Sequence, residues 1–271
     1  MIHTIMSTAQ VMETQPNPNE NSGFQVLSVV IPAYNEEKTI FRILQKVAEV
    51  KLIHGIRKEI IVVDDGSRDA TEQEVMRYNA LHPDTPAAYH RQPENRGKGA
   101  AIHRGVALAN GSYIVVQDAD LEYDPNDYNT LLKPVTDGIA DVVYGSRFAG
   151  GKPHRILFFW HTIGNRLLTF LSNALTNLNL SDMETCYKLF DTSMLKSLRL
   201  KEERFGFEPE VTAKISRVHG VRIYEVGISY YGRTYADGKK IRWKDGFRTI
   251  YCIIKYNIFH KNIFHKNIFH K

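Results

Sequence analysis

Between residues 26 and 150, short apolar runs rich in β-branched side chains alternate with segments of helical periodicity. The apolar runs predict buried strands at residues 26–32, 59–63, 113–116 and 140–144, with a weaker strand at 88–90. The segments between them predict helices that begin at Asn35, as an N-cap, and near residues 69, 97 and 125. Strands that alternate with helices predict an α/β fold, in which helices cover both faces of a mostly parallel sheet.

Polar residues follow four of the predicted strands at the point where each strand ends. They are Pro32-Ala-Tyr-Asn-Glu36, Asp64-Asp65, Asp118-Ala-Asp120 and Gly145-Ser-Arg147. In a parallel sheet these ends meet at one edge, which is where open α/β sheets bind their ligands. The pattern therefore predicts a nucleotide site at this edge.

Asp118 and Asp120 follow the apolar run at 113–116 and are two residues apart. Alternate side chains of an extended chain share a face, so both carboxylates can point off the end of the strand. Carboxylate oxygens are suitable ligands for Mg²⁺ or Mn²⁺, and the phosphates of a nucleotide would complete the site. A solvated acidic turn has the same local sequence, so the metal interpretation depends on the other loops at this edge.

Three common ligand motifs are excluded by spacing. Gly97-Lys98-Gly99 lacks the Ser or Thr that follows the lysine of a P-loop. The first strand is not followed by the GxGxxG pattern of a dinucleotide-binding fold. The acidic run from Asp118 has Tyr123 and Asn129 where an EF-hand calcium loop requires glycine and glutamate.

Composition divides the chain into three parts. Residues 1–24 are polar and without periodicity, so we expect a disordered leader there. Residues 25–240 are expected to form the α/β domain. Residues 241–271 are expected to hold a C-terminal helix and a tail in which Asn-Ile-Phe-His-Lys is repeated. A five-residue period fits neither a helix nor a strand, so the tail is interpreted as an appendage.

Charge is distributed unevenly along the chain, whose formal net charge is +5. Acidic residues predominate up to residue 150, which suits metal binding, and basic residues predominate afterwards, which suits an anionic partner such as a phosphate or a lipid surface. The basic residues alternate with apolar ones and match no nucleic-acid motif, so no nucleic-acid partner is expected. Two cysteines without CxxC spacing, and an N-terminus without signal-peptide character, favour a cytoplasmic protein.

Residues 155–178 are richer in aromatic and aliphatic side chains than the preceding domain. Trp160 and Leu167 lie on one stripe of the predicted helix, and a continuous helix would show Arg155 and Arg166 on one side. Arginines and asparagines interrupt the run, so it is not expected to span a bilayer. Two interpretations stay open: a helix that packs on the core, or a helix that lies on a membrane surface.

Four motifs resemble those of glycosyltransferase family 2, whose members have the GT-A fold. They are Ser28-Val-Val-Ile-Pro-Ala-Tyr-Asn-Glu36, Val62-Val-Asp-Asp-Gly-Ser67, Asn95-Arg-Gly-Lys-Gly99 and Gln117-Asp-Ala-Asp120. Further on, Gly145-Ser-Arg147, Cys186-Tyr-Lys188 and Phe207-Glu-Pro-Glu210 are similar to the branch that transfers sugars to polyprenyl or dolichyl phosphate. The resemblance implies a Rossmann-like GT-A sheet with C-terminal amphipathic helices, and a nucleotide-sugar donor of the GDP-mannose or UDP-glucose type.

The resemblance also implies roles for the matching positions. The residues at the nucleotide-sugar would be Pro32, Tyr34, Glu36, Lys98 and Gln117, with Asp64 or Asp65 at the base or ribose. The residues that hold Mg²⁺ or Mn²⁺ on the diphosphate would be Asp118, Asp120 and Glu122. The acceptor's phosphate would be gripped by Arg147 and Arg166, which together with Asp118 and Asp120 form the expected catalytic set. Arg233 and Lys239 would close over the donor.

The acceptor decides which further chemistry is needed. Sugar transfer builds negative charge on the departing nucleoside diphosphate, and a divalent ion neutralises that charge. A lipid phosphate is already an anion near neutral pH, so it needs positioning by arginines more than it needs a base. A saccharide hydroxyl, the acceptor in surface polysaccharide synthesis, requires a carboxylate base instead. The candidates for that base are Asp182, Glu184, Glu208 and Glu210.

Many bacterial relatives of this branch carry transmembrane helices after the catalytic domain, and none is expected in this sequence. We therefore expect a peripheral protein at the cytosolic face of a membrane, alone or with a membrane-protein partner, or an enzyme with a soluble acceptor. A non-catalytic nucleotide-sugar-binding protein is a further alternative, which donor hydrolysis or transfer would exclude.

Overall fold

The computed structural model describes residues 25–156, 158–233 and 243–259. They cover most of the predicted α/β domain and the predicted C-terminal helix. The expected leader at 1–24, Lys239, and residues 260–271 of the repeat tail lie outside the described residues.

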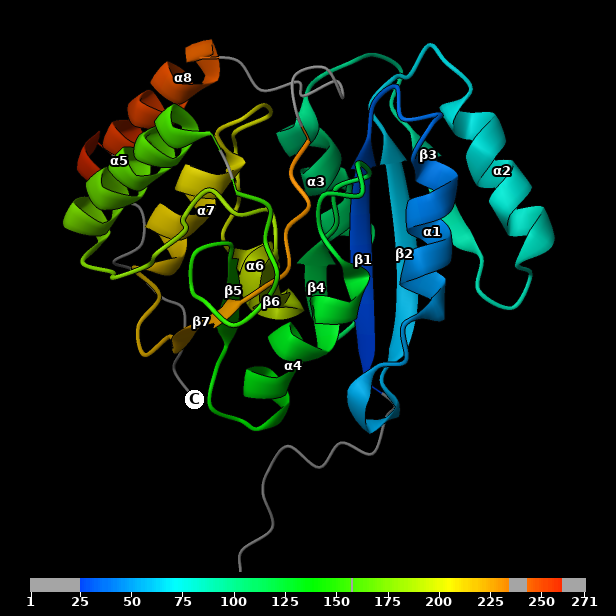
Figure 1. The fold of residues 1–271 in the computed structure, drawn as a ribbon, viewed down its shortest axis with the longest axis horizontal. Helices are drawn as coiled ribbons and strands as arrows, with labels where there is room; N and C mark the ends of the chain where they lie inside the picture. Colours follow the sequence, from blue (N-terminus) through cyan, green and yellow to red (C-terminus); the bar gives the residue numbers. More distant parts are fainter. Residues whose placement is uncertain (1–24, 157, 234–242, 260–271) are drawn as a thin grey trace, which may run out of the picture.

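A seven-stranded sheet forms the centre of the described structure, in the order β3-β2-β1-β4-β6-β5-β7 (Figure 1). Its strands are β1 (Val26–Ala33), β2 (Arg57–Asp64), β3 (Ala87–Arg91), β4 (Tyr113–Val116), β5 (Val142–Ser146), β6 (Lys188–Asp191) and β7 (Ile223–Gly227). β1 to β4 are mutually parallel, and β7 is parallel to β5. β6 is antiparallel to both of its neighbours, β4 and β5. The prediction of a mostly parallel sheet is confirmed.

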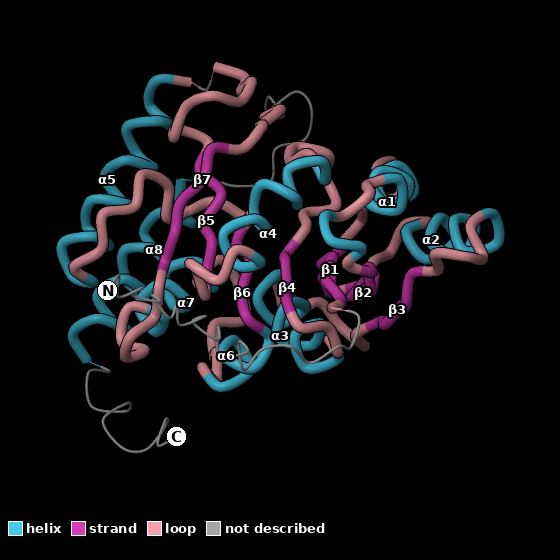
Figure 2. The backbone as a smooth tube through the Cα atoms, turned by 90° about the horizontal axis from the view of Figure 1, so that it is seen from below, coloured by secondary structure: helices cyan, strands magenta, loops and turns pink. Residues whose placement is uncertain are grey.

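Helices cover both faces of this sheet, as predicted (Figure 2). α1 (Ile40–Glu49) and α4 (Tyr128–Thr136) lie on one face, and α3 (Lys98–Leu108) and α6 (Thr192–Ser197) lie on the other. α2 (Thr71–Leu81) packs beside α1 and β3, at the edge of the sheet. Short 3₁₀ turns occur at Ile53–Gly55 and Pro125–Asp127.

The central strands are buried because almost all of their side chains are apolar. Val29, Val30 and Ile31 of β1, and Val115 of β4, have no solvent exposure. Burial on both faces is what a continuous apolar run predicts. Truncation of such a side chain typically costs about 2–5 kcal/mol, so the sheet is a firm support for the loops at its carboxyl edge.

Three local predictions need correction, and β6 is the first, because no strand is predicted at 188–191. This segment contains only two apolar residues, Leu189 and Phe190, and it begins with Lys188, whose side chain is nevertheless fully buried. A run this short carries no readable periodicity. Its strand conformation comes from pairing with β4 on one side and β5 on the other.

The predicted helix N-cap at Asn35 is wrong. α1 begins at Ile40, and Asn35 has a φ of 53°, in the left-handed region that asparagine tolerates better than most residues. Its side-chain oxygen accepts a hydrogen bond from the backbone N–H of Arg68 at 2.8 Å, and its own N–H donates to Ser67 Oγ at 2.9 Å. Asn35 therefore joins the loop after β1 to the loop after β2.

α5 (Phe159–Thr176) and α8 (Trp243–Ile254) pack against each other and against α7 (Phe207–Ile215), beyond the β5–β7 end of the sheet (Figure 1). α8 continues into a π-helical turn at Lys255–Phe259. The expectation that Arg155 and Arg166 share one side of a continuous helix is wrong, because α5 begins only at Phe159. Arg155 precedes it and donates a hydrogen bond to the carbonyl of Gly232 at 2.8 Å.

The outer surfaces of α5 and α8 expose large apolar side chains, of which Trp160 is 80% exposed and Phe247 65%. We call this set the apolar platform; it comprises Phe159, Trp160, Ile163, Leu167, Phe170, Leu175, Phe247, Tyr251 and Ile254. A contiguous apolar surface of this kind marks an interaction site. Within the described residues, no helix has the length and hydropathy needed to cross a bilayer.

Candidate active site

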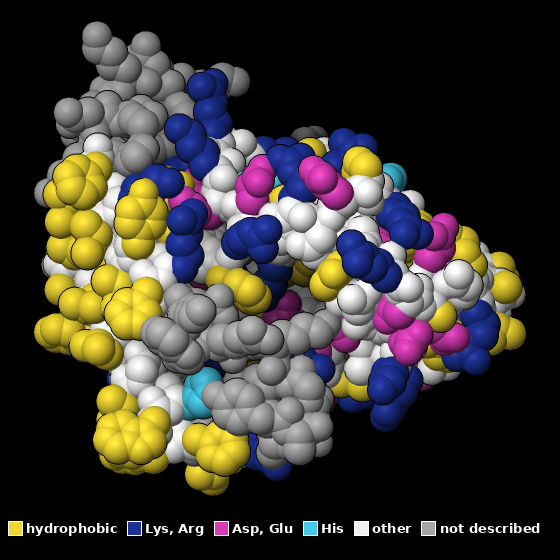
Figure 3. All heavy atoms as spheres, turned by 90° about the horizontal axis from the view of Figure 1, so that it is seen from above, with side chains coloured by type: hydrophobic (Ala, Val, Ile, Leu, Met, Phe, Trp, Pro, Cys, Tyr) yellow, Lys and Arg dark blue, Asp and Glu magenta, His cyan; other side chains and the backbone are white. Residues whose placement is uncertain are grey.

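A cavity of about 700 Å³ opens at the carboxyl edge of the sheet, where the sequence predicts a nucleotide site. Its walls come from the loops after β1, β2, β4 and β5, from the start of α3, and from α5, α7 and α8. Figure 3 looks down on this edge: basic side chains surround a hollow with acidic side chains inside it, and apolar side chains gather towards α5 and α8. The cavity therefore joins a charged region to the apolar platform.

Pro32, near the end of β1, and Tyr34 and Glu36, in the loop after it, line the cavity. The backbone N–H of Glu36 donates to Thr71 Oγ1 at 2.9 Å, which ties this loop to the start of α2. The structure thus brings three predicted nucleotide-binding residues to one cavity. Their contact with a nucleotide stays a prediction.

Asp64 and Asp65 follow one another but point to opposite sides of the end of β2. Asp64 is fully buried outside the cavity, where it accepts a hydrogen bond from the hydroxyl of Tyr89. Asp65 lines the cavity and accepts hydrogen bonds from the N–H groups of Arg96, at 2.9 Å, and Gly97, at 2.7 Å. Burial raises the pKa of Asp65, and these two N–H groups offset part of the rise. Of the two predicted alternatives, only Asp65 is placed to contact a nucleotide.

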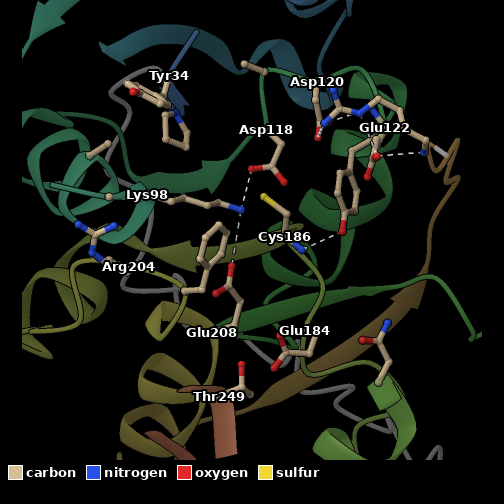
Figure 4. A pocket seen from close by; sticks show the side chains of 18 of the residues that line it. Tyr34, Lys98, Asp118, Asp120, Glu122, Glu184, Cys186, Arg204, Glu208 and Thr249 are labelled. Carbon is tan, nitrogen blue, oxygen red and sulfur yellow. Dashed lines mark hydrogen bonds and ion pairs between the residues drawn. The ribbon is translucent and has the colours of Figure 1, made fainter. Parts of the chain in front are cut away.

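Gly97 allows the start of α3 to approach the loop before α7. Its φ is 110°, and a side chain here would meet the carbonyl oxygen of Glu203 at 2.6 Å. The next residue, Lys98, has its Nζ 2.7 Å from Asp118 Oδ1 and 3.7 Å from Glu208 Oε1 (Figure 4). Burial lowers the pKa of Lys98, but the neighbouring carboxylates raise it by more, so the pKa lies well above its ordinary value. Lys98 is therefore a permanent cation inside the cavity.

Asp118, Asp120 and Glu122 all line the cavity, as the predicted metal site requires. Burial, and then the negative charges of Asp118 and Glu122, raise the pKa of Asp120 to about 7. Arg233 offsets part of that rise, with its Nη2 2.7 Å from Asp120 Oδ2. Crowded carboxylates of this kind favour a bound cation, because a cation relieves their mutual repulsion.

Asp118 and Asp120 therefore fit as oxygen ligands of Mg²⁺ or Mn²⁺. Glu122 has other partners: its Oε1 accepts from the N–H and Nε of Arg233, at 3.0 and 3.1 Å, and its Oε2 accepts from the Tyr230 hydroxyl at 2.6 Å. Across the residues that the structure describes, no three His, Cys, Asp or Glu side chains are grouped closely enough to hold a metal ion. The arrangement fits two protein carboxylates completed by a ligand, with Glu122 orienting Arg233.

Gln117 does not line the cavity, although the family resemblance implies a place at the nucleotide-sugar. The side chain is fully buried, and its Oε1 accepts hydrogen bonds from the hydroxyls of Tyr128 and Tyr187, both at 2.6 Å. Its Nε2 donates to the backbone carbonyl of Asp118 at 2.9 Å. Gln117 therefore holds the backbone of the Asp118-Ala-Asp120 motif in place from within the protein core.

Arg147 lines the cavity and forms a two-pronged ion pair with the fully buried Asp182. The Nε–Oδ2 and Nη2–Oδ1 distances are both 2.7 Å. Burial lowers the pKa of Arg147, but Asp182 raises it by more, so the guanidinium stays charged. Within the described residues Nη1 has no hydrogen-bond acceptor, so this nitrogen of the guanidinium is available to an anion in the cavity.

Arg166 lies on the exposed side of α5 and does not line the cavity, so its position does not support the predicted grip on the acceptor's phosphate. α5 presents His161 and Asn165 to the cavity instead, and sequence analysis misses both. It also misses Arg204, which lines the cavity from the loop before α7. The sequence feature that could have identified Arg204 is its position just before the Phe207-Glu-Pro-Glu210 motif.

The four candidate bases have different surroundings. Asp182 is neutralised by Arg147, and Glu210 is fully buried in an ion pair with Lys214 at 2.6 Å. Glu184 and Glu208 are the two that line the cavity.

The family model described as "Glycosyl transferase family 2" matches residues 28–199. A dolichyl-phosphate beta-glucosyltransferase of Trichomonas vaginalis is 28% identical over 270 residues, covering 92% of this chain and 81% of that protein. A dodecaprenyl-phosphate galacturonate synthase of Rhizobium johnstonii is also 28% identical; the match covers 79% of this chain but only 61% of that longer protein.

Solved structures resemble the chain in fold. Glucosyl-3-phosphoglycerate synthase from Mycobacterium tuberculosis, in complex with Mn²⁺, uridine diphosphate and glucosyl-3-phosphoglycerate, superposes with a TM-score of 0.66. The two sequences are 20% identical, and the match covers 90% of this chain and 86% of that chain.

Proposed function

Since the chain belongs to glycosyl transferase family 2 and is a glycosyltransferase of GT-A fold, we propose that it transfers a hexose from a nucleotide-sugar to polyprenyl or dolichyl phosphate. The family and fold expected from the sequence motifs are confirmed by these comparisons. The donor is of the UDP-glucose or GDP-mannose type, and Mg²⁺ or Mn²⁺ is the cofactor.

One observation carries the choice of acceptor. The cavity that holds Asp118 and Asp120 is also lined by Trp160 and Leu168 of α5 and by Thr249 of α8. These two helices expose the apolar platform on their outer surfaces. A polyprenyl phosphate has an anionic end and a long apolar chain, and this cavity offers a charged region beside an apolar surface. A small soluble acceptor does not need the apolar surface.

At the charged region we assign the nucleotide to Pro32, Tyr34, Glu36 and Asp65, and the diphosphate to Lys98 and Arg233. Arg204 is a further cation at the cavity, and within the described residues it has no ion-pair partner. When bound at Asp118 and Asp120, Mg²⁺ or Mn²⁺ supplies positive charge that neutralises the departing diphosphate.

The transfer is a single displacement. An oxygen of the lipid phosphate attacks the anomeric carbon, the bond from that carbon to the nucleotide's phosphate oxygen breaks, and the nucleoside diphosphate leaves with the electron pair. Attack from the side opposite to the leaving group inverts the anomeric centre. The acceptor oxygen is already anionic, so no base is required. Arg147 orients the acceptor's phosphate through its Nη1, because Asp182 fixes the other edge of the guanidinium.

The apolar platform is the surface that meets the membrane in this proposal. Apolar aromatic side chains that are more than half exposed, such as Phe159 and Phe170, are stabilised when they enter the boundary between headgroups and acyl chains. The protein would then work as a peripheral enzyme at the cytosolic face, directly on the bilayer or on a membrane-protein partner.

A saccharide hydroxyl is the second candidate acceptor. It would need a carboxylate base, and Glu184 and Glu208 both line the cavity where that base would be needed. An acceptor panel separates the two classes. The purified protein is incubated with UDP-glucose or GDP-mannose, Mn²⁺, and either undecaprenyl phosphate, dolichyl phosphate or oligosaccharides.

We expect metal-dependent formation of a hexosylated lipid phosphate. Transfer to oligosaccharides with none to lipid phosphate would overturn the proposed acceptor. Donor binding with neither hydrolysis nor transfer would instead support the non-catalytic alternative.

A further inference from the structure

A second cavity, of about 620 Å³, lies between the loop before α7 and the end of the chain formed by α8 and the turn after it. Four basic side chains line it, and we call it the basic groove: Lys201, Arg204, Arg248 and Lys255. Of the described residues, only Arg204 and Phe205 line both this groove and the catalytic cavity. The other three basic residues therefore have no role in the transfer described above.

The carboxylates in the basic groove do not balance its positive charge. Glu202 and Glu203 are the two that line it. Glu203 is neutralised by Arg96, which lies outside the groove. Glu202 forms ion pairs with both Arg248, at 2.5 Å, and Lys255, at 2.7 Å. One negative charge shared by two cations leaves one positive charge unbalanced.

Lys201 and Arg204 add two more positive charges. Both side chains are exposed, and within the described residues neither has an ion-pair partner. The planar fork of an arginine matches the oxygens of a phosphate, and a lysine adds a mobile point charge. Basic side chains that converge on an open groove in this way are suited to an anion with several oxygens.

The basic groove borders the apolar platform along α8. Arg248 and Lys255 each follow a platform residue by one position, Phe247 and Ile254 respectively. Tyr251 of the platform lies between them, with its ring centre 5.2 Å from Arg248 Cζ and 5.7 Å from Lys255 Nζ. In Figure 3, basic side chains border the apolar ones that gather towards α5 and α8. A tyrosine ring flanked by cations is typical of the depth at which lipid headgroups meet acyl chains.

We propose that the basic groove binds the phosphate of an anionic phospholipid whose acyl chains lie against the apolar platform; this rests on the proposed transfer at a membrane surface. A phospholipid satisfies the charge and the apolar surface together, whereas a soluble phosphate would leave the platform in water. The phospholipid is a different molecule from the acceptor, because the acceptor's phosphate must reach the cavity of Asp118 and Asp120.

A phospholipid in the basic groove would also orient the enzyme. Arg204 and Phe205 belong to both cavities, so an occupied groove places the catalytic cavity beside the bilayer surface. Anionic lipids are concentrated in the cytoplasmic leaflet, so the groove favours that face of the membrane.

The test compares two kinds of vesicle. Binding is measured by sedimentation with phosphatidylcholine alone, and with phosphatidylcholine that contains about 30% phosphatidylglycerol, which gives the surface a negative potential. The variants are Lys201→Gln and Lys201→Glu, with Lys51→Gln and Lys51→Glu as controls of equal charge change. Lys51 is exposed ahead of β2 and lines neither cavity.

Wild type should bind the anionic vesicles at least about tenfold more tightly than the neutral ones, with a smaller difference at high salt. Lys201→Gln should weaken binding to anionic vesicles by about fivefold and Lys201→Glu by about 30-fold, because each charge near such a surface contributes a similar factor. Binding to neutral vesicles should not change. Lys201→Gln keeps the test valid if the added carboxylate beside Glu202 and Glu203 destabilises Lys201→Glu.

Three results would overturn the site. Equal binding of wild type to both vesicles would show that no anionic lipid is recognised. Equal weakening by Lys51→Gln and Lys201→Gln would show a response to net charge without a site. Binding that rises with undecaprenyl phosphate in the vesicles, but not with phosphatidylglycerol, would show that the occupant is the acceptor.

Turnover in neutral detergent micelles separates this proposal from the function on which it rests. If wild type hexosylates polyprenyl phosphate in micelles but does not distinguish the two vesicles, the groove fails and the proposed function stands. If the Lys201 variants lose binding to anionic vesicles as expected, but wild type hexosylates no lipid phosphate, the proposed acceptor fails and the groove stands.

Discussion

Two regions of the molecule meet in one cavity and are built in opposite ways. The first is the acidic edge, which comprises Glu36, Asp65, Asp118, Asp120 and Glu122 on loops between buried parallel strands. Each of its aspartates has a polar partner: Asp65 has two backbone N–H groups, Asp118 has Lys98, and Asp120 has Arg233. The second is the apolar platform on α5 and α8, whose side chains are 39% to 80% exposed.

The donor and the acceptor's apolar chain require different precision in the positions of the side chains that bind them. Charged groups must be held within a fraction of an ångström to act on a reacting phosphate, so they sit on a firm sheet and are cross-linked by hydrogen bonds. An apolar chain needs only area removed from water, which is a non-directional requirement. The platform can therefore rest on two helices attached to the side of the sheet.

The largest expected effect tests the acidic edge. Asp120→Asn should lower the rate of sugar transfer by about a thousandfold, which corresponds to about 4 kcal/mol of transition-state stabilisation. Initial rates at saturating donor and Mn²⁺ measure it. Asp124→Asn is the matched control, because Asp124 is a nearby aspartate that caps a 3₁₀ turn outside the cavity. Unchanged metal-dependent transfer by Asp120→Asn would exclude this residue as a metal ligand.

The junction between the two regions depends on the ion pair of Arg147 and Asp182. Asp182→Ala leaves a buried guanidinium unpaired and should cost about 3–5 kcal/mol of unfolding free energy. The same two-pronged geometry occurs on the surface between Arg222 and Asp141, whose side chains are 49% and 31% exposed. Asp141→Ala should cost at most about 1 kcal/mol. Chemical denaturation measures both; equal losses would show that burial is not what makes the first pair important.

One carboxylate ties α8 and the π-helical turn after it to the loop before α7. Glu202, in the loop before α7, accepts hydrogen bonds from Arg248 of α8, from Lys255 Nζ at 2.7 Å and from the Tyr256 hydroxyl at 2.8 Å. Burial alone would raise the pKa of Glu202, but these three donors lower it to about 2. The ionised form is therefore more stable in the folded protein than in the unfolded chain.

A depressed folded-state pKa gives a defined pH dependence. The stabilisation by Glu202 should be complete above the ordinary pKa of about 4.5, and should be lost as the pH falls towards 2. Relative to Glu202→Gln, wild type should be about 1–2 kcal/mol more stable at pH 7, after allowance for solvent screening, and the gap should shrink between pH 4.5 and 3. Urea denaturation across this range measures it. A gap that stays constant from pH 7 to pH 3 would contradict the assignment, and Glu203→Gln, whose partner Arg96 is exposed, serves as the control.

The smallest expected effect is on the platform itself. Phe170→Ser and Phe247→Ser should each weaken binding to anionic phospholipid vesicles by about 10-fold, because each removes most of one aromatic side chain from the contact. Affinity for UDP-glucose should not change, since neither residue lines the cavity. Vesicle sedimentation measures the binding. Leu81→Ser removes a side chain of similar exposure, 63%, from α2 and should have no effect; an equal loss there would show that the contact is not specific to α5 and α8.

Local pattern was sufficient to predict most strands of the sheet, but not β6, and to predict the acidic motif. The strands at 26–32 and 113–116 have continuous apolar runs, and the parallel arrangement follows from their alternation with helices. Asp118 and Asp120 were predicted to share a face because they lie two residues apart beyond a strand end, and both do line the cavity. Periodicity acts over a few residues, so such features are readable without knowing the fold.

Tertiary structure decided which side of the chain each functional group faces. Asp64 and Asp65 are adjacent in sequence, yet the turn after β2 buries one against Tyr89 and exposes the other to the cavity. Arg166 has the right chemistry but lies on the outer side of α5, whereas Arg204 reaches the cavity because Gly97 lets its loop approach α3. The pairing of Arg147 with Asp182 also depends on contacts between segments distant in the chain. The sequence by itself therefore determined the fold class and the chemistry at the sheet edge, through short-range periodicity. Only the packing of remote segments decided which charges are paired, which are free, and which face the apolar platform.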